Sequence, residues 1–87
     1  MGKKQSKLFK KDLKRMSRRN VDFSLLDNVI EQLSAHLELE KKYMNHRLEG
    51  KYSLYMSCHI TPDWILIYRL DDKFLYLERT GTHSDLY

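Results

Sequence analysis

The stretch HITPDWILIYRL, residues 59–70, places a histidine and an aspartate directly before an apolar run. Two more histidines, His46 and His83, lie in segments that interrupt the apolar patterns before and after this run. An imidazole has a pKa of about 6.5, so a histidine can donate or accept a proton near neutral pH. Arg79, further along the chain, offers a rigid fork of donors that suits phosphate oxygens.

These residue types are the parts needed to cleave RNA without a metal ion. A base would remove the proton of a ribose 2′-hydroxyl, which attacks the adjacent phosphorus, and an acid would protonate the departing 5′-oxygen. A cation would stabilise the charge that develops in the transition state. Spacing alone leaves two other interpretations open, namely scattered surface histidines or a zinc site of two histidines and an aspartate.

Two helices are predicted in the first half of the chain. Apolar residues recur at helical spacing from Leu8 to Met16 and again up to about residue 38. Asn20 is suited to end the first helix because Asn tolerates the left-handed conformation, and Asp22 or Ser24 can cap the second. The fourth histidine, His36, falls at the end of the second helix pattern and is interpreted as an ordinary helix-end residue.

After Gly50 the hydrophobic period changes to that of strands. A half-buried strand is expected over residues 52–59, a central strand over 64–68 and a third strand over 74–79, with turns at 61–63 and 71–72 and a polar tail after residue 80. The sequence therefore predicts an α+β fold, with an N-terminal αα-hairpin packed on a small antiparallel β-sheet, as a single domain over residues 1–87.

Such a three-stranded meander would gather the reactive groups at one end of the sheet. The first strand ends where the second begins, so His59 and Asp63 are expected to be close. The third strand returns to the same end with Arg79, and His83 follows four residues later. Trp64, next to Asp63, would either stack a base or fill the core.

Charge is distributed unevenly along the chain. Residues 1–19 contain nine basic residues and one acid, Asp12, a net charge of +8, whereas residues 20–87 contain seven basic and eleven acidic residues, a net charge of −4. A block this basic either binds a polyanion, meets an acidic partner or forms a solvated helix face. If it binds RNA, the residues expected to do so are Lys10, Lys11, Lys14 and Arg15.

Composition excludes several classes of protein. No apolar run approaches the roughly 18 residues of a membrane span, and no signal-peptide pattern opens the chain, so a cytoplasmic location without a membrane partner is expected. Cys58 is the only cysteine, which rules out an internal disulfide and a cysteine cluster for zinc.

Residues 46–87 resemble the YafQ branch of the RelE/ParE toxin superfamily in both order and spacing. The segment HRLEG matches the family's H-x-L-x-G loop, and CHITPDWILIY matches its strand–turn–strand with histidine and P-D-W. The ending ERTGTHSDLY matches R-T-G-[ST]-H-x-x-L-aromatic, and FKKDLKRMSRR is similar, more loosely, to the family's first helix.

The resemblance implies a RelE-like, microbial-RNase-like fold and the toxin of a type II toxin–antitoxin pair. It implies a ribosome-dependent mRNA endonuclease, an mRNA interferase, that uses neither a metal nor another cofactor. The partners it implies are mRNA in the ribosomal A site and a cognate antitoxin of the DinJ or RelB type.

The resemblance also implies roles for individual residues. It assigns proton transfer to His46, His59, Asp63 and His83, and phosphate binding to Arg79. Tyr87 stands where the family usually has Phe beside the substrate. We favour His83 as the acid and place the other proton-transfer groups on the base side.

One departure and two rival functions stay open. The family opens with an apolar alternating strand, where this chain has MGKKQSK, so the first strand is expected to be short or missing, at most a polar edge strand. A ParE-like topoisomerase-inhibiting toxin would not need the histidines. A non-catalytic RNA- or partner-binding module would use the basic helix for affinity.

Overall fold

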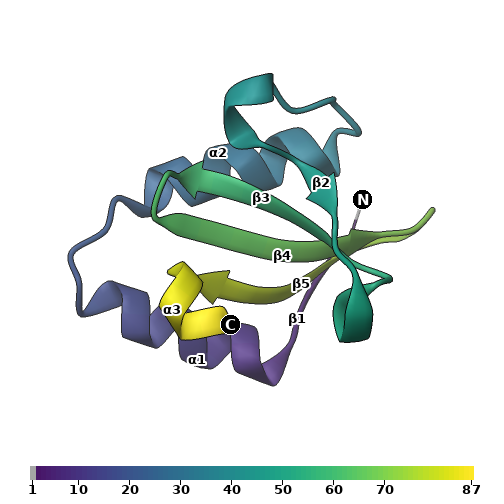
Figure 1. Cartoon of the computed structure of the whole chain (residues 1–87). Coiled ribbons are helices and arrows are strands. Elements are labelled where there is room, and N and C mark those ends of the chain that lie inside the picture. The colour runs from purple at the N-terminus through teal and green to yellow at the C-terminus, as the bar shows by residue number, and fades with distance from the viewer. Residues whose placement is uncertain (1) are drawn as a thin grey trace.

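A computed structural model describes residues 2–87. It has an α+β architecture, which confirms the predicted fold class (Figure 1). The helices are α1 (Lys7–Ser17), α2 (Phe23–Ser34) and α3 (His83–Leu86), with 3₁₀ turns η1 (Lys41–Tyr43) and η2 (Gly50–Tyr52). The strands are β1 (Gly2–Gln5), β2 (His46–Arg47), β3 (Met56–Thr61), β4 (Trp64–Leu70) and β5 (Phe74–Gly81). None of the helices in the described chain is long and apolar enough to cross a bilayer.

The five strands form one sheet in the order β1-β5-β4-β3-β2. The central meander of β3, β4 and β5 is antiparallel, as predicted, and β2 adds a short antiparallel edge. The other edge corrects the prediction of a wholly antiparallel sheet, because β1 pairs in parallel with β5. The sequence does not indicate this pairing, because the two strands lie near opposite ends of the chain.

The first strand, which was expected to be short or missing, is present and short. All four of its residues are exposed, so it lacks the apolar alternation by which strands are recognised. Backbone pairing holds it against β5, and the Lys4 ammonium lies 4.2 Å from the centre of the Phe74 ring. The Ser6 hydroxyl then donates to the Glu78 carbonyl and accepts from the Phe9 amide, so the strand passes directly into α1.

The predicted αα-hairpin is confirmed, although its second helix is shorter than expected. Asn20 takes the left-handed conformation after α1, with φ 55°, and the Asp22 carboxylate caps α2 at the Ser24 amide, 3.0 Å away. The helix α2 ends at Ser34 rather than near residue 38, because His36 turns the chain with φ 58°. Leu37, which continued the apolar pattern, is consequently 57% exposed.

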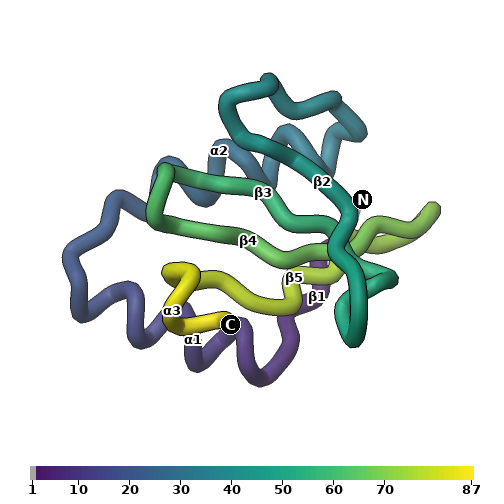
Figure 2. The backbone as a smooth tube through the Cα atoms, in the orientation of Figure 1, coloured from purple at the N-terminus to yellow at the C-terminus, as the bar shows by residue number. Residues whose placement is uncertain are grey.

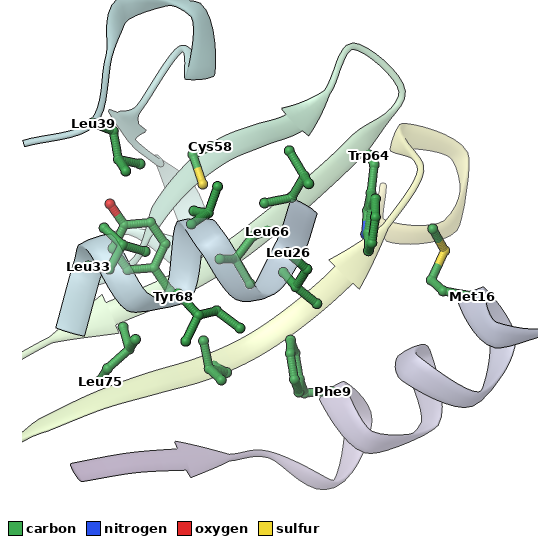
Figure 3. Packing of buried hydrophobic residues seen from close by; sticks show 14 residues of the cluster. Phe9, Met16, Leu26, Leu33, Leu39, Cys58, Trp64, Leu66, Tyr68 and Leu75 are labelled. Atoms are coloured by element: carbon green, nitrogen blue, oxygen red, sulfur yellow. The ribbon is translucent and has the colours of Figure 1, made fainter. Parts of the chain in front are cut away.

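Both long helices cover the same face of the sheet and enclose the main core (Figure 3). Apolar side chains from α1 and α2 meet the alternate residues of β3, β4 and β5 that point toward them; Leu66, for example, is 0% exposed. The backbone view shows α2 behind the sheet and α3 in front of it, so α3 lies on the opposite face (Figure 2). A smaller apolar cluster of Ile65, Ile67 and Leu86 forms beneath α3.

Two local predictions are wrong in ways that concern the site. The strand expected over residues 52–59 begins only at Met56, because Gly50, with φ 69°, opens the turn η2. The expected polar tail forms helix α3, which is held to the sheet by Leu86, 8% exposed. A capping box between Thr82 and Asp85 stabilises this short helix.

Candidate active site

The open face of the sheet brings the predicted proton-transfer histidines together. His46 from β2, His59 from β3 and His83 from α3 line one cavity of about 260 Å³, with Ile65 at its floor and Tyr87 beside it. An adjoining cavity of about 470 Å³ shares His59, Ile65 and His83 and adds Asp63 from the β3–β4 turn. The strand ends and the short helix thus converge as the predicted topology requires.

His46 and His59 are each tethered through the same ring nitrogen. Nδ1 of His46 lies 2.8 Å from the carbonyl oxygen of Met44, and Nδ1 of His59 lies 3.3 Å from that of Pro62. A carbonyl can only accept, so Nδ1 is the donor in both pairs. In the neutral ring Nε2 is then left without a proton, and it is available to accept one. Both histidines therefore have the tautomer of a general base.

His83 occupies a different environment at the start of α3. Its side chain is exposed, and its ring centre lies 4.8 Å from that of Tyr87, with the two planes tilted by 36°. Among the described residues, His83 has no carbonyl tether of the kind seen at His46 and His59. His83 is thus held by the position of its helix and by an aromatic neighbour, and it lines the same cavity as the tethered pair.

The position of α3 depends on Asp85. This carboxylate accepts from the Thr82 amide at 2.9 Å and from Arg19 at 2.6 and 3.1 Å. The hydrogen bonds from Arg19, and then those from Thr82, hold the pKa of Asp85 far below its usual range. A Cβ atom at Gly81 would lie 3.0 Å from an Asp85 carboxylate oxygen, so glycine permits the close approach. Asp85 therefore links the C-terminal end of α1 to the helix that carries His83.

Arg79, the predicted phosphate-binding cation, is engaged by Asp12 rather than free in a cavity. Its Nε lies 2.7 Å and its Nη2 3.1 Å from the two carboxylate oxygens of Asp12, and its side chain is 14% exposed. These hydrogen bonds raise the pKa of Arg79, so the guanidinium stays charged. Asp12, 1% exposed, also accepts from the Thr80 amide at 3.1 Å. The pair fixes the orientation of Arg79, and Nη1 remains outside its contacts with Asp12.

Trp64 does not belong to the site. It points into the core under the helices, is 3% exposed, and donates its indole N–H to the Thr80 hydroxyl at 2.8 Å. Phe23 packs edge-on against it at 5.9 Å between ring centres. The hypothesis that Trp64 stacks a base is wrong because both faces of the indole are covered. Of the two roles left open for Trp64, the structure shows the core role.

Only some of the basic side chains of α1 are free to contact RNA. Lys10, Lys11 and Lys14 are exposed along α1, as an RNA-contacting surface requires. Arg15 differs, because its guanidinium lies 3.2 Å from Asp12 and 3.9 Å from Asp85. Arg15 therefore belongs to the carboxylate network that joins α1 to β5 and α3.

The buried cysteine is a poor candidate for the chemistry. Cys58 is 0% exposed, and burial raises the pKa of its thiol to about 12, so it is neither a ready nucleophile nor a ready ligand. Within residues 2–87 no three His, Cys, Asp or Glu side chains gather in a way that could hold a metal ion. The interpretation as a zinc site of two histidines and an aspartate therefore has no ligand group to support it.

Sequence reasoning missed two carboxylates that position the site. Asp12 was noticed only as the one acid in a basic block, although an acid on the apolar side of such a helix is a signal for a buried ion pair. Asp85 follows Thr82 at the spacing of a capping box, a pattern that also predicts the missed helix α3. Neither residue lines the histidine cavities, so both act through the groups they hold.

Comparison with known proteins agrees with this geometry. The chain matches the model of the bacterial YafQ toxin of type II toxin–antitoxin systems over residues 1–87. It is 41% identical over 80 residues to the mRNA interferase toxin YafQ of Escherichia coli K12, which covers 91% of this chain and 87% of that protein.

Solved structures agree as well. The crystal structure of the E. coli DinJ–YafQ complex superposes with a TM-score of 0.89 at 40% identity, over 98% of this chain and 96% of that chain. A copper-bound mutant toxin from Helicobacter pylori gives a TM-score of 0.94 at 34% identity, over 100% and 99% of the two chains. The matched model spans all 87 residues, so the resemblance in the sequence is confirmed, and the chain belongs to the YafQ toxins of type II toxin–antitoxin systems.

Proposed function

We propose that this chain is an mRNA interferase, an endoribonuclease that cuts mRNA in the ribosomal A site by metal-independent acid–base catalysis. The observation that carries the proposal is that His46 and His59, both tethered through Nδ1, line one cavity together with His83. This is the arrangement of a base and an acid on either side of a phosphodiester. The E. coli relative is named an mRNA interferase, which supports the same activity.

The reaction follows from these positions. Nε2 of His46 or His59 takes the proton of the ribose 2′-hydroxyl, and the oxygen attacks the adjacent phosphorus. The bond from phosphorus to the 5′-oxygen breaks, and His83 gives that oxygen a proton. The products are a 2′,3′-cyclic phosphate on the upstream fragment and a 5′-hydroxyl on the downstream fragment. Asp63, in the adjoining cavity, lies on the base side and would assist His59.

The remaining predicted site residues take supporting roles in this proposal. Arg79, oriented by Asp12, stabilises the charge on the phosphate through its guanidinium. Tyr87 packs beside His83 and contacts the downstream nucleotide. Lys10, Lys11 and Lys14 bind ribosomal RNA, with Arg15 contributing charge from the carboxylate network.

Ribosome dependence follows from the small size of the catalytic surface. The histidine cavities of about 470 and 260 Å³ lie on an 87-residue chain, so they can fix little of the RNA. Alignment of the 2′-hydroxyl with the phosphorus is worth roughly 7–11 kcal/mol in well-oriented systems. The decoding site already holds mRNA in order, and we therefore place the reaction there, in the cytoplasm.

A cognate antitoxin of the DinJ or RelB type completes the proposal, since a solved relative is a DinJ–YafQ complex. The ParE-like alternative is disfavoured because topoisomerase inhibition needs no tethered histidines. The non-catalytic alternative is disfavoured for the same reason.

The test compares naked mRNA with mRNA programmed on ribosomes, using toxin that has been treated with chelator and then freed of it. Discrete cuts are expected only on ribosomes, with no loss of activity after the treatment. Rapid cutting of naked mRNA, or activity that returns only when metal is restored to the toxin, would overturn the proposal.

A further inference from the structure

An apolar cavity outside the proton-transfer site lies directly beside it. It has a volume of about 490 Å³ and lies between η1, the start of α2 and the end of β3. Leu25, Tyr43 and Met44 line it, and so does His59. Leu25 and Met44 are 42% and 61% exposed, so the cavity is a surface that no other part of the described chain covers. Exposed apolar surface at the edge of a reactive site is a common mark of ligand binding.

Two of its residues connect this cavity to the base side of the reaction. His59 lines both this cavity and the histidine cavity. Met44 contributes its side chain here, while its carbonyl oxygen holds Nδ1 of His46 at 2.8 Å. Met44 has the left-handed conformation, with φ 49°. His83, the acid, does not line the apolar cavity.

We infer that this cavity binds the nucleobase of the nucleotide directly 5′ of the cut, the one whose 2′-hydroxyl attacks. The inference rests on the proposed function and names a subsite of it. The ribose that approaches His46 and His59 carries its base only one bond away, so that base must lie on their side of the site. The apolar cavity adjoins His59 and is not lined by His83, whereas His83 and Tyr87 would adjoin the downstream nucleotide.

The chemistry of the walls suits a nucleobase. Tyr43 offers an aromatic ring, and bases stack on such rings with little dependence on sequence. The Lys42 ammonium lies 5.2 Å from the centre of this ring, where it can also reach a flanking phosphate. An apolar pocket edged by one cation matches a base on its sugar–phosphate chain better than it matches a charged side chain.

The test combines a change in the RNA with a change in the protein. Ribosomes are programmed with mRNA that carries either the natural nucleotide or an abasic one directly 5′ of the cut, and kcat/KM is measured for each. The protein variants are Tyr43→Ala and Met44→Asn, since asparagine keeps the left-handed backbone that holds His46. Lys41→Ala is the matched control, because Lys41 is exposed in the same turn and does not line the cavity.

In the wild type and in Lys41→Ala, the abasic change is expected to lower kcat/KM by about tenfold, the order expected for one stacked base. For Tyr43→Ala, kcat/KM on natural mRNA is expected to be about tenfold lower than for the wild type. The abasic change should lower it no further, because the two changes remove the same contact. Met44→Asn is expected to show the same non-additivity to a smaller degree, and it carries the test if Tyr43→Ala does not fold.

Three outcomes would overturn the inference. If the wild type cuts but the abasic change lowers kcat/KM by the same factor in every variant, the subsite is wrong and the proposed function stands. If the variants cut normally and lose only affinity for a purified cognate antitoxin, the cavity is an antitoxin contact. If the wild type cuts no mRNA on ribosomes, the subsite and the proposed function fail together.

Discussion

The face of the sheet under α1 and α2 and the face that carries α3 use the same three strands in different ways. Under the long helices, side chains such as Leu66 and Leu75 are 0% exposed and belong to one cluster that includes both helices. On the other face the apolar cluster is small, and the reactive histidines lie around it. The covered face thus contains the core that stabilises the fold, while the open face carries the candidate reactive groups.

The groups of the open face are positioned by a few polar contacts and a small apolar cluster rather than by the main core. Two carbonyl oxygens orient His46 and His59, and one carboxylate, Asp85, ties the helix of His83 to Arg19. A residue in the covered core is replaceable only at a cost in stability, because many neighbours share its contacts. A residue on the open face can be lost with little effect on stability and a large effect on chemistry. Mutations should therefore separate the two faces.

The largest effect is expected from His83→Gln on the open face. Removal of a general acid typically lowers the rate by about 10²–10⁴. The side chain is exposed, so the free energy of unfolding should change by no more than about 0.5 kcal/mol. Single-turnover cutting of ribosome-bound mRNA and urea unfolding measure the two quantities. Cutting by the folded variant at the wild-type rate would contradict the role of His83.

Leu66→Ala should show the opposite behaviour on the covered face. Deleting a fully buried leucine costs about 2–5 kcal/mol through lost burial and a residual cavity. Cutting per folded molecule should stay at the wild-type level when it is measured below the unfolding transition. Leu54→Ala is the matched control, because Leu54 is 72% exposed. A loss of activity larger than the unfolded fraction explains would mean that the two faces are coupled.

Asp85→Asn tests the contact that joins the faces. Loss of the carboxylate should loosen α3 and lower the cutting rate by roughly tenfold, less than the roughly 10²-fold that a misplacement of 1 Å can cost. The hydrogen bonds from Arg19 lower the pKa of Asp85 in the folded state. The carboxylate therefore stabilises the fold above its unfolded pKa of about 3.9, and the contribution is lost as the pH falls below that value toward the folded pKa.

The stability difference between wild type and Asp85→Asn should thus be full near pH 7 and shrink in strong acid. Urea unfolding at a series of pH values measures it, with Asp72→Asn as a control in the exposed β4–β5 turn. A difference that grows as the pH falls would have the wrong sign for this ion pair.

The smallest effect per residue is expected on α1. Reversal of Lys10, Lys11 and Lys14 to Glu should weaken ribosome binding and flatten its salt dependence, by up to about 0.9 in the slope of log affinity against log salt for each lost contact. Lys73→Glu, at the exposed β4–β5 turn, is the control. Arg15 is left unchanged because it pairs with Asp12. A slope equal to that of the wild type would assign the lysines to antitoxin binding or to solubility.

Much of the fold could be predicted because its signals are local. The central meander and the αα-hairpin follow from apolar periods, and the roles of Asn20 and Asp22 follow from turn and capping chemistry. The strand β1 could not be predicted in this way, since its residues are exposed and its partner β5 lies about seventy residues away. Polar strands held by backbone pairing leave no pattern in the side chains.

The clustering of the histidines could be predicted from the sequence, but the contacts that orient them could not. Histidines at strand ends and the family resemblance together select His46, His59 and His83, and the structure places them around one cavity. The burial of Trp64 and the pairing of Arg79 with Asp12 depend on where α1 crosses the end of β5, which is a long-range feature. Sequence reasoning therefore selected histidines that the structure places around one cavity, but it did not identify the residues that orient them.

The central claim is that the open-face histidines cut RNA by using its own 2′-hydroxyl. The direct measurement places a single 2′-deoxy nucleotide immediately 5′ of the cut in ribosome-programmed mRNA and follows cleavage at that bond. We predict no cut there, together with 2′,3′-cyclic phosphate ends at the same bond in unmodified mRNA. Cutting of the deoxy-substituted bond at the unmodified rate would contradict the account.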